Sequence, residues 1–145
     1  MLLADVNVFL YAHRPESARH DEYKGWLEQA LAGPEPFAVS ELVLSSFVRI
    51  ATHHRVYREP TPPAVALDFC AAVLGAPAAV AIRPGPGHWT LFTGLLSEAG
   101  ARGNAVPDAY LAALAVEHGA TWVTTDRGFA RFPGFAGRSP SRRRS

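Results

Sequence analysis

Four acidic residues in this sequence have the types and positions that metal-assisted chemistry requires. They are Asp5, Glu41, Asp108 and Asp126. Each follows a predicted strand or opens a predicted helix. Because open α/β sheets bind ligands beyond the carboxyl ends of their strands, we expect the four carboxylates at one edge of a sheet. Two like charges ~4 Å apart repel by roughly 4 kcal/mol at an effective dielectric of about 20. Carboxylates gathered at such distances either have raised pKa values or bind a divalent cation that neutralises their charge.

The elements that must position these acids alternate between strand and helix along the chain. Strands are predicted at residues 2–6, 37–39, 78–82 and 121–125. Helices are predicted at residues 7–13, 17–31, 41–54, 64–74, 88–101 and 107–118, with a short helical turn at 128–132. This alternation predicts an α/β fold: one domain with a central parallel sheet of four to five short strands, flanked by helices on both faces.

Composition indicates a globular domain without a general affinity for polyanions. The chain has 145 residues, of which 48% are hydrophobic and 19% charged, as in folded domains. The net charge of +1 hides an asymmetry, because residues 138–145 contain four arginines and no acid. The preceding body has ten basic and thirteen acidic residues, a net charge of −3. Charge alone therefore gives no support to nucleic-acid binding by the body.

Several classes of site are excluded by the absence of their residues. Cys70 is the only cysteine, so an intrachain disulfide and a thiolate zinc cluster cannot form. The sequence has no HExxH, no GxxxxGK[ST], no GxGxxG after a strand and no GxSxG. The longest uncharged stretches have 14 residues, fewer than the ~20 of a membrane span. The N-terminal apolar run lacks the basic start of a signal peptide, and we expect a cytoplasmic protein with no membrane association.

Each acid also has an explanation that involves no chemistry. Glu41 and Asp108 could complement helix dipoles, a contribution of about 0.3–1 kcal/mol. Asp5 could cap the helix that begins near Asn7, and Asp126 could cap the turn that follows it. Asp108 differs from an ordinary solvated aspartate, because the residues three, four and seven positions later are all apolar. A carboxylate at the start of an apolar helix face is costly unless it has a partner.

Four segments of the sequence together resemble the motifs of PIN domains, especially those of VapC-type toxins of bacterial toxin–antitoxin pairs. The segments are Asp-Val-Asn-Val-Phe-Leu-Tyr-Ala at 5–12, Ser-Glu-Leu at 40–42, Gly-Asn-Ala-Val-Pro-Asp-Ala-Tyr-Leu-Ala-Ala-Leu-Ala at 103–115 and Gly-Ala-Thr-Trp-Val-Thr-Thr-Asp-Arg-Gly-Phe at 119–129. The resemblance extends from residue 1 to about residue 135. The order and separation of the four motifs make it specific.

The resemblance implies a metal-dependent endoribonuclease that cleaves structured RNA, commonly tRNA or ribosomal RNA. It implies that Asp5, Glu41, Asp108 and Asp126 are the catalytic residues and bind Mg²⁺ or Mn²⁺. Asp5 and Asp108 are the strongest candidates for metal ligands, and Glu41 and Asp126 would hold a second ion or orient water. Oxygen ligands without cysteine or histidine suit these hard cations. It further implies a cognate VapB-type antitoxin as partner and a homodimer. The domain would span residues 1–136, followed by a disordered Arg/Ser/Pro-rich tail at 137–145.

Further side chains are candidates for supporting roles around the acids. We expect Asn7, Asn104 and Thr125 to donate hydrogen bonds near the metal ligands, and Arg127 to contact a phosphate. Other candidate phosphate contacts are Arg55, Arg58 and Arg102. One departure concerns the end of the domain. Toxins of this type usually continue into a final short strand, but residues 135–140 contain no β-like run, so the sequence leaves a fifth strand open.

Two other functions are possible for a parallel α/β domain of this kind. The first is a phosphoryl-transfer α/β protein, such as a haloacid-dehalogenase-like phosphatase or a receiver domain. These proteins need a second aspartate two positions after the first, or a lysine at the end of a strand. Asp5 is followed two positions later by Asn7, and the only lysine, Lys24, lies in a charged helix, so neither requirement is met. The second is an inert PIN-fold module that binds RNA or protein. An inert site would have no reason to keep four mutually repelling carboxylates.

Overall fold

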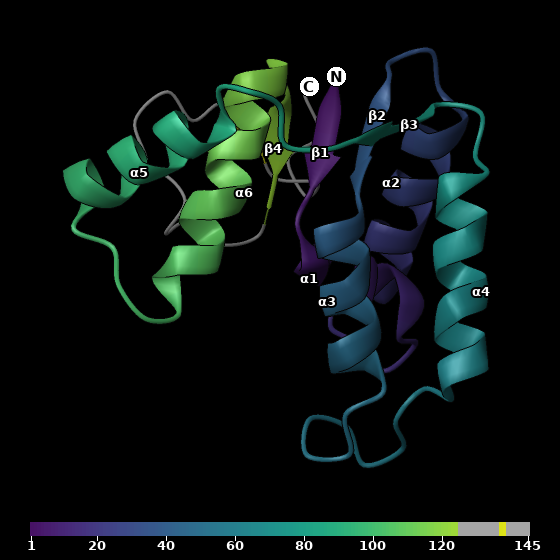
Figure 1. The fold of residues 1–145 in the computed structure, drawn as a ribbon. Helices are drawn as coiled ribbons and strands as arrows, with labels where there is room; N and C mark the ends of the chain where they lie inside the picture. The colour runs from purple at the N-terminus through teal and green to yellow at the C-terminus, as the bar shows by residue number, and fades with distance from the viewer. Residues whose placement is uncertain (125–136, 139–145) are drawn as a thin grey trace.

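The computed structural model of the chain describes residues 1–124 and 137–138, and these residues form one parallel sheet covered by helices (Figure 1). The strand order is β3-β2-β1-β4-β5, and every neighbouring pair is parallel. The strands are β1 Leu2–Ala4, β2 Phe37–Ser40, β3 Ala79–Ile82, β4 Thr121–Val123 and β5 Gly137–Arg138. The helices are α1 Val6–His13, α2 His20–Ala32, α3 Glu41–Ala51, α4 Pro63–Leu74, α5 His88–Ala99 and α6 Ala105–His118. The predicted α/β architecture is confirmed.

Two hydrophobic cores lie on opposite faces of the sheet. Leu2 and Ala4 of β1 pack into the core shared with α1, α2, α3 and α4, whereas Leu3 packs into the core shared with α5 and α6. Figure 1 shows the two groups of helices on either side of the strands. Successive side chains of a strand point to opposite faces, so a strand buried on both faces is a continuous apolar run. This explains the sequence Leu-Leu-Ala before Asp5. No helix in the described part of the chain is long and apolar enough to cross a membrane.

The parallel register brings the residues that follow three strands to one edge. Leu2 of β1 pairs with Phe37 of β2 and with Thr121 of β4. The next residues after β1, β2 and β4 therefore lie along the carboxyl edge. Helix α6 precedes β4 and runs in the opposite direction. The chain leaves the helix at Gly119, whose φ of +63° is a left-handed conformation that glycine adopts without strain. The first turn of α6 consequently lies at the same edge.

Several predicted boundaries differ from the structure, for local reasons. The first strand ends at Ala4 and not at residue 6, because Asp5 caps α1. The second helix begins at His20, after Arg19 in a left-handed conformation with φ +61°. Helix α6 begins at Ala105, so Pro107 is its third residue and not its first. Proline is tolerated there because the first N–H groups of a helix have no partner within it.

The fifth strand, which the sequence left open, is present. Gly137 pairs with Trp122 and Arg138 with Val123, so the sheet includes the first two residues of the segment that the sequence analysis assigned to the tail. A strand of two residues is held by backbone hydrogen bonds and needs no run of β-branched side chains, which is why the composition of this segment gave no signal. Residues 139–145 and the predicted turn at 128–132 lie outside the described residues.

Arg14 ties the end of α1 to the loop between α3 and α4, residues 52–62. Its side chain is buried, and its guanidinium donates to the Thr61 hydroxyl at 3.0 Å and to the Glu59 carbonyl at 2.8 Å. The same group lies 4.0 Å from the centre of the Tyr57 ring and 2.5 Å from a Glu16 carboxylate oxygen. One cation thus satisfies polar groups from two distant segments of the chain.

An Arg14→Met variant is expected to lower the free energy of unfolding by roughly 2–4 kcal/mol, because the acceptors at Thr61 and Glu59 lose a charged donor. Urea denaturation measures the change. Arg14→Lys keeps the charge but not the planar fork of donors, so its free energy of unfolding should lie between those of the wild type and Arg14→Met. A midpoint for Arg14→Met equal to that of the wild type would show that Arg14 does not anchor the loop.

His13 makes the stability of the fold depend on pH. Its Nε2 lies 3.0 Å from the Thr61 hydroxyl, and its ring packs edge-on against Phe47 and Phe69. Burial, and secondly the charge of Arg14, hold the pKa of His13 below its usual value of 6.5. The unfolded chain therefore binds a proton at this site more readily than the folded chain. The free energy of unfolding should fall as the pH drops below about 6.5, and urea titrations of wild type and His13→Gln at about pH 7.5 and 5.5 should show a smaller fall for the variant.

Candidate active site

Asp5 is a buried carboxylate held at both oxygens. It lies between β1 and α1, and only 4% of the residue is exposed. Oδ1 accepts the Asn7 backbone N–H at 2.6 Å, so Asp5 caps α1, and Oδ2 accepts the hydroxyl of Thr124. The backbone N–H of Asp5 donates to the Val123 carbonyl at 3.0 Å. The donors in these two bonds are neutral groups, so the two bonds orient the side chain without adding a counter-charge. The capping explanation for Asp5 is confirmed, and it is compatible with metal binding.

Thr124 is a site residue that the sequence analysis missed. The sequence analysis named Thr125 among the candidate donors, and that residue lies outside the described residues. The structure places the neighbouring, buried Thr124 against Asp5. The feature that identifies Thr124 as a partner of Asp5 is the register between strands β1 and β4. Ala4 of β1 pairs with Val123 of β4, so the next residue of each strand, Asp5 and Thr124, are neighbours across the sheet edge. That register is a long-range property, because 119 positions separate the two residues.

A Thr124→Val variant should reveal what this hydrogen bond contributes. Valine keeps the shape but removes a donor to a buried carboxylate, so the free energy of unfolding is expected to fall by roughly 1.5–3 kcal/mol. Thr124→Ser retains the hydroxyl and should recover most of the difference. Guanidinium or urea unfolding at neutral pH measures both. Equal losses in the valine and serine variants would assign the effect to packing and not to the hydrogen bond.

Asp108 lies at the same edge, in the first turn of α6. It is half-buried, and Ala112 and Ala115 on its side of the helix are buried against the sheet, as the sequence pattern predicted. Asn104 is the N-cap of this helix, is exposed and makes no side-chain capping bond. The half-buried side chain of Asn7 belongs to the second residue of α1. The asparagines thus lie at the starts of the two helices that carry or follow the predicted metal ligands.

Glu41 is exposed and faces a cation that the sequence analysis did not consider. It is the first residue of α3, its side chain is 71% exposed, and its Oε1 lies 3.2 Å from Nη2 of Arg83. Arg83 directly follows β3, the strand beside β2. An exposed ion pair of this kind contributes at most about 1 kcal/mol. Within residues 1–124, no three His, Cys, Asp or Glu side chains form a group that could hold a metal ion. Asp126 and Arg127 lie outside the described residues.

The donor chemistry at this edge nevertheless fits Mg²⁺ or Mn²⁺. The side chains available there are oxygen donors, the type that these cations prefer. Asp5 is oriented by two hydrogen bonds, and carboxylates that bind metals are commonly fixed by such outer contacts. The donor types of Asp5 and Asp108 are thus compatible with a divalent cation.

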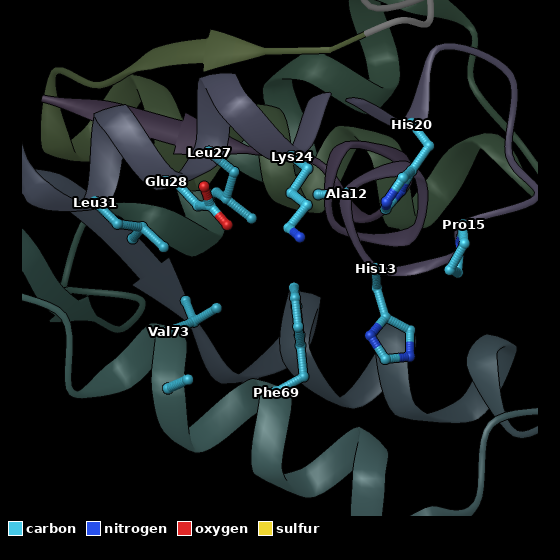
Figure 2. A pocket seen from close by; sticks show the side chains of 11 residues that line it. Ala12, His13, Pro15, His20, Lys24, Leu27, Glu28, Leu31, Phe69 and Val73 are labelled. Atoms are coloured by element: carbon cyan, nitrogen blue, oxygen red, sulfur yellow. The ribbon is translucent and has the colours of Figure 1, made fainter. Parts of the chain in front are cut away.

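A separate cavity of about 380 Å³ lies between α1, α2 and α4. Its walls are mostly apolar, and Figure 2 shows Leu27 and Leu31 of α2 across from Phe69 and Val73 of α4. The predicted acids do not line it. His13 and His20 lie at its rim, but both already serve the fold, since His20 Nδ1 is 2.7 Å from the Tyr11 carbonyl. Among the described residues, its titratable side chains do not form a group that could hold a metal ion.

Comparisons with known proteins agree with this architecture. The family model described as PIN domain matches residues 2–134. VapC ribonuclease Mb2897 of Mycobacterium bovis is 46% identical over 97% of this chain and 95% of its own length. Ribonuclease VapC31 of Mycobacterium tuberculosis is 44% identical over 91% of this chain and 93% of its own.

Solved structures show the same fold. The crystal structure of VapBC2 from Rickettsia felis bound to a DNA fragment from their promoter matches with a TM-score of 0.70 and 20% identity, over 95% of this chain and 97% of that one. FitAcB from Neisseria gonorrhoeae matches with a TM-score of 0.67 and 21% identity, over 97% and 98%. The family match and the two sequence relatives show that this chain is a member of the PIN domain family, of the VapC type.

Proposed function

We propose that this chain is the ribonuclease toxin of a VapBC-type toxin–antitoxin pair, and that it hydrolyses phosphodiester bonds of structured RNA, tRNA or ribosomal RNA, with Mg²⁺ or Mn²⁺. Near-full-length similarity to proteins named VapC ribonuclease supports the reaction class. The observation that supports metal-dependent chemistry best is the buried Asp5, fixed at both oxygens beside the start of α1. Because RNA is the substrate, we expect the reaction to take place in the cytoplasm.

The residues have distinct parts in this proposal. Asp5 and Asp108 would hold the cation, and Asn7 and Thr124 keep the Asp5 carboxylate aimed by their hydrogen bonds. A bound divalent cation supplies charge stabilisation for the phosphodiester and makes water a better nucleophile at neutral pH. Glu41 would turn from Arg83 to the reacting groups, and losing an exposed pair costs at most about 1 kcal/mol. Asp126 would complete the acid set, with Asn104, Thr125 and Arg127 as polar contacts around it.

Incubation of the purified protein with total RNA and Mg²⁺ tests the proposed reaction. Discrete fragments that accumulate with time are expected, because a structured RNA presents few accessible cleavage sites. Sequencing of the fragment ends then identifies the RNA. An unchanged RNA population, with both Mg²⁺ and Mn²⁺ and over a range of protein concentrations, would contradict the nuclease function and favour the inert module.

Protein partners are the second part of the proposal. We expect a VapB-type antitoxin, and self-association as a homodimer. Exposed apolar side chains of α4 support a protein partner, because Val65, Leu67 and Leu74 are each more than 40% exposed on a helix with one charged residue. Exposed apolar surface of this kind is typical of interaction sites. Co-expression with the product of an adjacent short reading frame should give a complex that no longer cleaves RNA, and light scattering gives the mass of both species.

A further inference from the structure

The loop between α3 and α4, together with the end of α3, carries more basic than acidic side chains. Residues 42–62 contain three arginines, two histidines and one acid, Glu59, in a body of net charge −3. Arg55 and Arg58 are exposed, and no acidic side chain of residues 1–124 lies within salt-bridge distance of either. Other arginines of the described chain, such as Arg19 and Arg83, are paired with glutamates. The loop therefore offers local attraction to an anion.

The loop backbone is already ordered, so its side chains are presented from fixed positions. The Thr61 N–H donates to the Ala51 carbonyl at 2.8 Å and closes the base of the loop. The N–H groups of Val56 and Tyr57 both donate to the His53 carbonyl, at 3.0 and 3.1 Å. Beneath them, the buried Arg14 holds Tyr57, Glu59 and Thr61, as described above. A preordered loop loses less conformational entropy when it binds a ligand.

Two stacked imidazole rings lie beside the arginines. The rings of His53 and His54 are 5.4 Å apart at their centroids with an interplanar angle of 19°. The backbone N–H of Arg55 donates to Nδ1 of His53 at 3.1 Å and fixes this ring. His54 is exposed. A flat aromatic ring next to guanidinium groups is the combination that binds unstacked bases and their phosphates in single-stranded nucleic acid.

The position of the loop relates it to the acids. Helix α1 begins directly after Asp5, helix α3 begins with Glu41, and the two helices pack against each other. Both lead away from the sheet edge toward this loop, which Figure 1 shows at the far end of α3. With eleven residues, α3 has a length of about 16 Å. An RNA strand cleaved at the acids would extend over several nucleotides to reach the loop.

We propose that His54, Arg55 and Arg58 form a substrate-binding surface for a single-stranded part of the RNA, at a distance of several nucleotides from the cleaved bond. This inference rests on the proposed nuclease function and names where its substrate is bound. An acidic segment of a partner protein is the other anion that the arginines could attract. RNA is favoured because the stacked imidazoles provide a surface for bases, for which an acidic peptide has no counterpart.

Binding measurements with charge-matched variants test the role of the arginines. The double variant Arg55→Gln/Arg58→Gln is compared with Arg19→Gln/Gln29→Glu, which changes the net charge equally at two exposed positions, one just before α2 and one within it. All proteins carry Asp108→Asn to prevent turnover, and the probe is fluorescently labelled unfractionated tRNA at several KCl concentrations. The loop variant should bind about tenfold more weakly. The slope of log K against log [salt] should fall by about 1.4, or 0.7 for each lost phosphate contact. The α2 control should keep the wild-type slope.

Substitution of His54 separates stacking from charge. His54→Ala should weaken tRNA binding at least about fivefold and leave the salt slope unchanged, because a base loses its stacking partner. His54→Phe keeps an aromatic face and should retain most of the affinity. These proteins are also made with Asp108 intact, so that cleavage is measured apart from binding.

The outcomes distinguish this inference from the function on which it rests. Wild-type affinity and salt slope in the loop variants, with normal cleavage, would overturn the inference and leave the nuclease function standing. Weaker binding of poly-glutamate by the arginine variant, with unchanged tRNA binding, would overturn it in favour of an acidic protein partner. A wild type that neither binds nor cleaves RNA would overturn both.

Discussion

Replacing Asp108 by asparagine is expected to reduce RNA cleavage by about 10³-fold or more while the protein stays folded. A divalent cation stabilises the charge of the transition state by several kcal/mol, which corresponds to a factor of roughly 10³ in rate. Asparagine has nearly the same shape as aspartate but lacks the charge that attracts the cation. Initial rates on the identified RNA with saturating Mg²⁺ measure the loss, and urea unfolding shows that the variant is folded.

Asp21→Asn is a matched control for this substitution. Asp21 is also an aspartate in the first turn of a helix, α2, and it is exposed. Both variants lose the same interaction with a helix dipole, about 0.3–1 kcal/mol, but only Asp108→Asn should lose cleavage. Asp5→Asn should behave like Asp108→Asn, because its amide oxygen can still accept the Asn7 N–H. Cleavage by Asp108→Asn at the rate of Asp21→Asn would show that Asp108 serves the helix alone.

Removal of divalent cations is expected to reduce RNA cleavage about as strongly as the Asp108→Asn substitution. In EDTA, cleavage by the wild type should become undetectable, and an excess of Mg²⁺ or Mn²⁺ should restore it, because carboxylates alone carry the wrong charge to stabilise a phosphate. A second measurement is independent of activity. Mg²⁺ at 100 times its dissociation constant should raise the free energy of unfolding by about 2.7 kcal/mol.

The metal-dependent stabilisation has its own control. An Asp5→Asn/Asp108→Asn variant should show little change in its melting temperature when Mg²⁺ is added, since both proposed ligands have lost their charge. Full cleavage by the wild type in EDTA would refute the metal-dependent mechanism even if the chain proves to be a ribonuclease. Equal stabilisation of wild type and double variant by Mg²⁺ would place the cation elsewhere.

Local features of the sequence predicted the fold because each element has a strong local cause. Leu2, Leu3 and Ala4 form an apolar run followed by a capping aspartate, and this predicted a buried strand that turns directly into a helix. Gly119 predicted the end of α6 because a left-handed residue was needed there. The fifth strand had no such cause. Gly137 and Arg138 join the sheet through the backbone groups that β4 offers, which depend on where the edge of the sheet lies.

The residue types at the ends of strands and the starts of helices can be read from the amino-acid sequence, and they predict that Asp5, Glu41 and Asp108 lie along one edge of a parallel sheet. The partners of these acids depend on the long-range arrangement of the strands. Thr124 reaches Asp5 because β4 pairs with β1 in a particular register, and Arg83 reaches Glu41 because β3 lies beside β2. The physical reason is range: a cap or a helix stop is fixed by neighbours in sequence, whereas strand order and register follow from the packing of the whole sheet.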